Sequence, residues 1–270
     1  MRRCIELASK NIGYTFPNPL VGSVVVFNNK IIGEGFHAKY GESHAEVNAI
    51  NSVKNKGLLK DSTLYVNLEP CNHYGKTPPC TEAIINNNIK KVVIGSQDPN
   101  RLVNGSGIEK LRFSGCDVSV GIMDKECDEL NKRFFTYHKL KRPFIILKWA
   151  ETKDGFISPI KSVKTLKKVN WISGEDAKKL SHKWRSEEHS ILVGVQTIID
   201  DDPILTTRFV KGRSPIRFVL DPNLRIPLDS RILSDNLKTI VLSKKVNKLI
   251  PNYSKAIDFG DINLIIQSLY

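Results

Sequence analysis

The sequence predicts an α/β protein made of two domains. Along the first half of the chain, apolar strand-like segments alternate with helix-like segments, a pattern typical of a sheet whose faces are covered by helices. The chain has 270 residues, enough for two domains with separate cores. The alternation is broken at Lys141-Arg142-Pro143, and a new apolar segment begins immediately afterwards. We therefore expect a first domain over residues 1–141 and a second domain over residues 142–270.

Hydrophobic periodicity and turn residues define the elements expected in the first domain. An N-terminal helix precedes two strands joined at Asn28-Asn29, a pair that tolerates the positive φ of a tight hairpin turn. A polar loop at residues 98–107 precedes the fourth helix. The expected helices are 2–11, 43–55, 79–88, one that follows residue 107, and 124–139; the expected strands are 20–27, 30–36, 63–68, 91–95 and 118–122.

The second domain is expected to begin with an apolar strand at residues 144–149. A polar stretch then leads to a helix at 174–189 and to three strands, at 191–195, 216–221 and 239–243. Residues 261–270 are expected to form a further helix, because Ile262, Leu264, Ile265 and Leu269 give that segment one apolar face.

Composition and charge limit which binding partners and which cellular compartment are expected. The net charge is +13, which permits nucleic-acid binding, but no basic run is interleaved with aromatic residues as a stacking platform requires. We expect no nucleic-acid partner; the lysines cover solvated faces, and a few cations bind a phosphorylated small molecule. No apolar run approaches the ~20 residues that span a bilayer, so no membrane partner is expected. The five cysteines form no disulfide framework, and the N-terminus resembles a helix more than a signal peptide, which favours a cytoplasmic protein.

The strongest chemical signal is His44-Ala45-Glu46 followed by two cysteines, Cys71 and Cys80. A hydrolytic zinc site has three protein ligands and an open position for water, and His44, Cys71 and Cys80 supply three suitable donors. His44 and Cys80 each open an expected helix, whose positive end favours the thiolate that zinc binds. Glu46 is then the candidate general acid and base, because zinc deaminases use a glutamate that is not a ligand.

Each of these residues also has a simpler interpretation. His44 alone would be a structural or surface histidine, and Glu46 could close a capping box begun by Ser43. A non-catalytic zinc module is a further alternative, although a structural zinc has no use for a spare carboxylate beside three ligands. His73 is a weaker candidate ligand, and the remaining cysteines, Cys4, Cys116 and Cys127, are expected to be buried or incidental.

The segment 70–80 departs from the common zinc-deaminase signature, because eight residues instead of two separate the cysteines. This segment, with its Thr77-Pro78-Pro79 insertion, resembles the deaminase domain of the bifunctional riboflavin-synthesis family RibD. The resemblance covers roughly the first 140 residues through several ordered motifs. The motifs are Pro17-Asn18-Pro19-Leu20-Val21-Gly22, residues 33–37, residues 41–46, Asp98-Pro99-Asn100 and Gly105-Ser106-Gly107.

The resemblance implies a cytidine-deaminase-like fold, a mixed sheet with helices on both faces. It implies that the substrate is 2,5-diamino-6-(5-phosphoribosylamino)pyrimidin-4-one, a phosphorylated pyrimidine, and that zinc assists the hydrolytic loss of its 2-amino group. Asn18 and His37 would contact this substrate, and Lys76 is a candidate for its phosphate. The family also suggests a homo-oligomer.

The second half contains no Gly-x-Gly-x-x-Gly, so a standard dinucleotide fold has no support. Residues 148–155, 171–174, 192–197 and 201–208 resemble the RibD reductase domain, which has a dihydrofolate-reductase-like α/β fold and uses NADPH to reduce the ribosyl group to ribityl. By this resemblance Ala150, Trp171, Thr197 and Asp201 would contact NADPH, and Arg185, Leu205 and Arg208 would hold the substrate. Two arginines suit a phosphate through charge-assisted hydrogen bonds. Taken alone, Arg185 would be a surface ion-pair residue and Trp171 a core residue.

Two departures bear on the reductase region. Val169 stands where the family often has serine or threonine, and Asp221-Pro222 stands where it often has Asp-Ser. The sequence given also ends at Tyr270, before the family's cofactor-phosphate loop. We expect residues 1–270 to retain the deaminase but to bind NADPH poorly, with a bifunctional enzyme if the natural chain is longer. The alternatives are a deaminase with a non-functional reductase region and a nucleic-acid deaminase.

Overall fold

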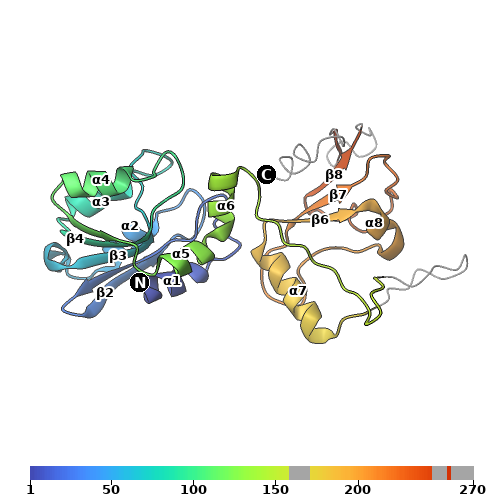
Figure 1. The fold of residues 1–270 in the computed structure, drawn as a ribbon, viewed down its shortest axis with the longest axis horizontal. Helices are drawn as coiled ribbons and strands as arrows, with labels where there is room; N and C mark the ends of the chain where they lie inside the picture. The colour runs from blue at the N-terminus through green and yellow to red at the C-terminus, as the bar shows by residue number, and fades with distance from the viewer. Residues whose placement is uncertain (158–170, 245–253, 257–270) are drawn as a thin grey trace, which may run out of the picture. The chain divides into compact units, whose positions relative to one another are not determined.

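The computed structural model describes residues 1–157 and 171–244 and the backbone strand at 254–256. The chain divides into two units, Met1–Phe144 and Ile145–Tyr270 (Figure 1). Each unit has its own sheet and its own hydrophobic core, as the α/β pattern of the sequence predicted. Each is described by itself.

The first unit is built on a five-stranded mixed sheet with strand order β2-β1-β3-β4-β5. β1 pairs antiparallel with β2 and β3, whereas β3, β4 and β5 run parallel. The hairpin between β1 and β2 turns at Asn28 and Asn29, which both adopt positive φ, as expected for a two-residue turn. The strands are β1 (Gly22–Phe27), β2 (Lys30–Phe36), β3 (Thr63–Leu68), β4 (Lys91–Ser96) and β5 (Asp117–Val120).

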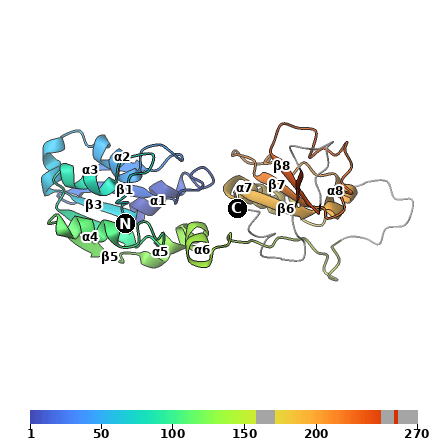
Figure 2. The same cartoon turned by 90° about the horizontal axis from the view of Figure 1, so that it is seen from above.

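Helices cover both faces of this sheet, as the views in Figures 1 and 2 show. α1 (Arg2–Ser9) and α5 (Asp124–Leu130) contact one face, and α2 (Ala45–Ser52), α3 (Cys80–Asn86) and α4 (Ser106–Phe113) contact the other. Branched aliphatic side chains fill the core between the sheet and the second group of helices, among them Val25, Leu64, Val66, Ile84 and Ile94. The cytidine-deaminase-like fold expected from the sequence is confirmed.

The expected helix at 124–139 is two helices, α5 and α6 (Lys132–Leu140), separated at Asn131. The side chain of Asn131 is buried, accepting a hydrogen bond from the backbone N–H of Leu20 and donating one to the Leu20 carbonyl. A long-range contact therefore interrupts a segment whose periodicity is helical throughout. The 3₁₀ helix η1 (Lys56–Asp61), which follows the end of α2, was not predicted from the sequence.

In the second unit, four parallel strands are ordered β6-β7-β8-β9. They are β6 (Ser190–Gly194), β7 (Ile216–Leu220), β8 (Thr239–Ser243) and β9 (Ser254–Ala256), with helices α7 (Glu175–Glu187) and α8 (Val195–Asp201). The first three strands and α7 match the expected positions closely. The short α8 and β9 were not predicted.

The strand expected at 144–149 is wrong: these residues form no ladder with any described strand. Apolar residues alone do not make a strand, because the backbone needs a partner for its hydrogen bonds. Leu147 is 78% exposed and Trp149 is 64% exposed, so the segment also lacks a packed face. The expected helix at 261–270 and Val169 lie outside the described residues. Across the described part of the chain, no helix combines the length and apolar character needed to cross a bilayer.

Candidate metal centre and active site

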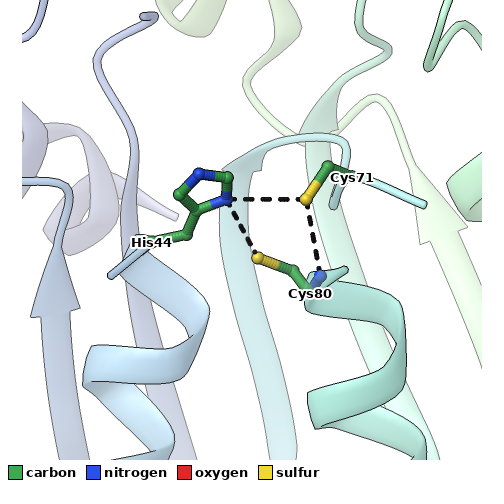
Figure 3. A group of neighbouring side chains, drawn as sticks. All are labelled: His44, Cys71 and Cys80. Carbon is green, nitrogen blue, oxygen red and sulfur yellow. Dashed lines mark hydrogen bonds between the residues drawn. The ribbon is translucent and has the colours of Figure 1, made fainter. Parts of the chain in front are cut away.

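His44, Cys71 and Cys80 meet at one point of the first unit, where their ligand atoms lie within 4.8 Å of one another. The Nδ1 atom of His44 is 3.2 Å from Sγ of Cys80 and 3.5 Å from Sγ of Cys71. Figure 3 shows the imidazole and the two thiols pointing toward one another from separate segments. His73, the weaker candidate, is not a member of this group.

The spacing of these donors fits zinc. With zinc–sulfur bonds of about 2.3 Å and zinc–nitrogen bonds of about 2.0 Å, tetrahedral geometry separates the nitrogen and sulfur ligands by about 3.5 Å. The observed separations, 3.2 and 3.5 Å, are close to that value. One imidazole and two thiols are also the borderline and soft donors that zinc prefers. Three protein ligands leave a fourth position for water.

Helix starts position two of the three donors. His44 is the residue before α2, with extended backbone angles, and Cys80 is the first residue of α3, directly behind Pro79. The backbone N–H of Cys80 donates to Sγ of Cys71 at 3.4 Å. Hydrogen bonds from Cys80 lower the pKa of the Cys71 thiol, which favours a thiolate at this point.

Glu46 lies in the first turn of α2 and is only 3% exposed. The capping-box interpretation of this residue is wrong, because His44, not Ser43, precedes the helix and no side chain caps it. The Glu46 carboxyl group interacts instead with the Cys80 thiol. Burial, and secondly the charge on Cys71, raise the pKa of Glu46 to about 7. The carboxyl group therefore lies beside the metal ligands in a desolvated position.

Two glycines of β2 bring α2 close to the sheet. A Cβ atom at Gly35 would lie 2.3 Å from the backbone nitrogen of Ala49 and 2.5 Å from the carbonyl oxygen of Ala45. A Cβ atom at Gly33 would lie 2.5 Å from the carbonyl oxygen of Ala49. Only glycine permits this approach, so Gly33 and Gly35 determine how deep His44 and Glu46 sit.

Asn18 and His37, the predicted substrate contacts, lie together beside this centre. Asn18 Nδ2 is 3.0 Å from His37 Nε2, and the His37 ring packs edge-on against the His44 ring with centroids 5.3 Å apart. His37 Nδ1 is 3.3 Å from the Ser43 carbonyl, which can only accept, so Nδ1 carries the proton and Nε2 accepts from Asn18. Asn131 helps to hold the segment that carries Asn18 through its two hydrogen bonds to Leu20.

Glu69 is a supporting residue that was not predicted from the sequence. It is buried at the end of β3, and its carboxylate accepts four backbone N–H groups, those of Asp98, Gly105, Gly107 and Ile108, at 2.9–3.3 Å. It thereby ties the 98–108 loop and the start of α4 to the segment that carries Cys71. A charged residue directly after a buried strand was the available signal. Lys76 lies in an exposed loop, with its ammonium 4.1 Å from the Tyr40 ring centroid.

In the second unit, the three predicted substrate residues gather around Thr206. Arg185 on α7 donates to the Thr206 carbonyl at 3.1 Å, and Arg208 donates to the Thr206 hydroxyl at 2.9 Å. Leu205, directly before Thr206, is buried and adopts a positive φ of 58°. Arg185 does not form the surface ion pair of the simpler interpretation: in the described residues no carboxylate pairs with either arginine.

The four predicted NADPH contacts occupy less enclosed positions. Trp171 is 61% exposed, with the Lys178 ammonium 3.8 Å from its ring centroid, so it is not a core residue. Thr197 and Asp201 share α8, and Ala150 is half-buried in the extended segment after α6. Their roles stay predictions.

A mixed sheet covered on both faces, with a His/Cys/Cys group and a buried glutamate at two helix starts, defines the first unit as a zinc-dependent deaminase domain of the cytidine deaminase class. Comparison with family models agrees: residues 1–96 match the cytidine and deoxycytidylate deaminase zinc-binding region, and residues 143–258 match the RibD C-terminal domain. The chain belongs to the RibD family of riboflavin biosynthesis proteins.

Individual relatives support this assignment. The chain is 47% identical to riboflavin biosynthesis protein RibD of Aquifex aeolicus, covering 92% of this chain and 68% of that protein. It is 37% identical to the Escherichia coli RibD, covering 86% and 65% respectively. The crystal structure of a diaminohydroxyphosphoribosylaminopyrimidine deaminase/5-amino-6-(5-phosphoribosylamino)uracil reductase from Thermotoga maritima is 40% identical, with a TM-score of 0.90 over 100% of this chain and 76% of that one. The chain thus spans about two thirds of the length of these curated relatives.

Proposed function

We propose that the first unit removes the 2-amino group of 2,5-diamino-6-(5-phosphoribosylamino)pyrimidin-4-one by hydrolysis during riboflavin synthesis. The observation that carries this proposal is the cluster of His44, Cys71 and Cys80 within 4.8 Å, with the buried Glu46 beside it. His44, Cys71 and Cys80 hold the zinc, which when bound polarises a water for attack on the ring. A purely structural zinc would not explain the spare carboxyl group.

Glu46 is the proton carrier of the proposed reaction. It takes a proton from the attacking water and passes it to a ring nitrogen; it then takes the proton of the newly added hydroxyl group and delivers it to the amino group, which leaves as ammonia while the C=O bond forms. Its burial serves this role, because a proton carrier without competing water exchanges protons with the substrate alone. Asn18 and His37 orient the pyrimidine next to it, and Lys76 binds the substrate phosphate from the loop.

The second unit is proposed to reduce the ribosyl group of the deaminated product to ribityl with NADPH. Arg185, Leu205 and Arg208 hold the phosphorylated product, supported by the convergence of both guanidinium groups on Thr206. Ala150, Trp171, Thr197 and Asp201 contact NADPH. The proposed setting is the cytoplasm, and a homo-oligomer is the proposed assembly.

One assay tests both activities on the 270-residue chain. Zinc content is measured, ammonia release is followed with the free phosphoribosylaminopyrimidine and with single-stranded nucleic acid, and NADPH oxidation is followed after deamination. We expect ammonia only from the free pyrimidine; NADPH oxidation after deamination would show the reductase activity proposed for the second unit. Ammonia from nucleic acid would favour a nucleic-acid deaminase, and ammonia without NADPH oxidation would leave a deaminase alone.

A further inference from the structure

His182 is a buried histidine beside the two substrate arginines of the second unit. It lies on α7, three residues before Arg185, and is only 3% exposed. Its ring packs edge-on against Phe209, with centroids 4.6 Å apart. Neither the metal centre nor the predicted cofactor contacts account for this buried imidazole.

Both nitrogens of this ring face N–H groups. The backbone N–H of Arg208 donates to Nδ1 at 2.9 Å, and Nη1 of Arg185 lies 3.4 Å from Nε2. A neutral imidazole has one accepting nitrogen, and an imidazolium has none. The shorter contact, from the backbone, identifies Nδ1 as the acceptor. Nε2 therefore carries the proton.

The consequence is that two donors, Nε2–H of His182 and the guanidinium of Arg185, face each other without an acceptor between them. The guanidinium of Arg208 is held nearby through Thr206, to which Arg185 also donates. Burial, and secondly the positive charges of Arg185 and Arg208, lower the pKa of His182 to about 4. The ring therefore stays neutral near pH 7 and is fixed in one tautomer. Its Nε2–H can donate a hydrogen bond, and its accepting nitrogen, Nδ1, is already occupied by the backbone N–H of Arg208.

We infer that His182 is a direct ligand of the substrate phosphate, donating from Nε2 to an oxygen that Arg185 also binds. An anionic oxygen placed between the two N–H groups converts their repulsion into two hydrogen bonds. The ligand chemistry is a phosphate monoester on a sugar. The inference rests on the proposed substrate role of Arg185 and Arg208 and adds a third, uncharged donor to it.

Two substitutions separate this role from a merely structural one. Asparagine can place an oxygen where Nδ1 lies, so H182N keeps the acceptor for Arg208 and removes the Nε2 donor. Glutamine reaches the position of Nε2, so H182Q keeps the donor and removes the acceptor. If His182 binds phosphate, H182N weakens binding and H182Q retains most of it. If His182 only fixes the Arg208 loop, the order is reversed.

The experiment titrates the full chain with ribose 5-phosphate, with ribose as the phosphate-free probe. We expect H182N to lose about 10- to 100-fold in affinity for ribose 5-phosphate, as for a hydrogen bond to a charged group, and no change with ribose. Lys183→Gln removes an exposed charge on the same helix and is the matched control, with less than about twofold change. In the wild type, the Nε2–H resonance of His182 shifts on saturation in ¹⁵N-resolved NMR.

The results distinguish failure of this inference from failure of the proposed function. Binding that is lost in Arg185→Gln but unchanged in H182N, or an Nε2 that carries no proton, overturns the role of His182 and leaves the substrate site in place. Binding unchanged in both variants, or no binding by the wild type, overturns the phosphate site as a whole. The deaminase and NADPH-oxidation assays report on the proposed activities independently.

Discussion

The candidate sites of the two units differ in how deeply their functional side chains are buried. In the first unit, Glu46 and Cys80 are buried, and the helix that carries Glu46 is pressed against two glycines. In the second unit, Trp171 and Arg208 are exposed, whereas His182, Leu205 and Thr206 are buried. Burial raises the pKa of Glu46 and so suits this carboxyl group to carry a proton, whereas residues that receive a large soluble cofactor must remain open until it binds.

The difference predicts where substitutions act. In the first unit, changes at the site are expected to act on chemistry, because the site residues are already in place. In the second unit, substitutions of buried residues such as Arg217 are expected to lower the free energy of unfolding. Arg217 is 0% exposed on β7 and binds Asp235 through two hydrogen bonds and the carbonyls of Ile204, Ile232 and Leu237 at 3.0 Å.

The largest effect is expected for Cys80→Ser. A serine hydroxyl is a poor zinc ligand, so the variant should release zinc and lose all measurable deamination. Metal analysis and ammonia release measure the two outcomes. Cys116→Ser is the matched control, since Cys116 lies away from the cluster and should keep full zinc content. Full zinc occupancy in Cys80→Ser would show that the ligands are different residues.

Glu46→Gln should keep zinc and fold but lower the turnover number by about 10²–10⁴-fold, the usual contribution of general acid–base catalysis. The amide has the shape of the carboxyl group but cannot carry the proton. Turnover under saturating substrate and zinc content are measured together. Near-normal turnover would remove Glu46 from the chemistry and weaken the contrast between the two units.

Arg217→Leu should destabilise the second unit by about 3 kcal/mol or more, because three carbonyls and the Asp235 carboxylate lose their donor. Deamination by the first unit should be unaffected. Calorimetric unfolding and ammonia release measure both, and Arg225→Leu, at an exposed position, is the control. Loss of deaminase activity in Arg217→Leu would show that the two units are energetically dependent.

Gly35→Ala should cost about 1–3 kcal/mol, the range for overpacking, because the new methyl group meets the α2 backbone at 2.3 Å. Displacement of α2 moves His44 and Glu46, so ammonia release should fall as well. Gly57→Ala is the control, since its Cβ would meet only the flexible Asn55 side chain, at 3.2 Å. Unchanged activity in Gly35→Ala would mean that the close packing of α2 on Gly35 does not determine the positions of His44 and Glu46.

The smallest effect near neutral pH concerns the titration of His182. The pKa of His182 is lowered from 6.5 to about 4 by burial, and then by Arg185 and Arg208. The unfolded chain therefore takes up this proton first as pH falls. Stability of the second unit should be unaffected above pH 6.5 and decline by at most about 1.4 kcal/mol per pH unit down to pH 4. Unfolding free energies of the wild type and H182N, which cannot titrate, should diverge only in that window.

Much of the first unit follows from local patterns. The strands at 30–36 and 63–68 and the turn at Asn28-Asn29 were predicted at their observed positions, because period-two alternation and turn residues act over a few residues. The donor set His44, Cys71 and Cys80 was also recognised from residue types and helix starts. Zinc chemistry admits few ligand combinations, so the residue types and their order along the chain carried that prediction.

Other features were decided only by contacts between distant segments. Asn131 interrupts a helical pattern because its amide binds Leu20, 111 residues away, and Glu69 gathers backbone N–H groups from a loop 29–39 residues away. Residues 144–149 have a strand composition but no ladder. Nothing in the local sequence around His182 shows that the backbone of Arg208 fixes its tautomer. Hydrogen bonds need a partner of defined position, and that position exists only once the chain has folded.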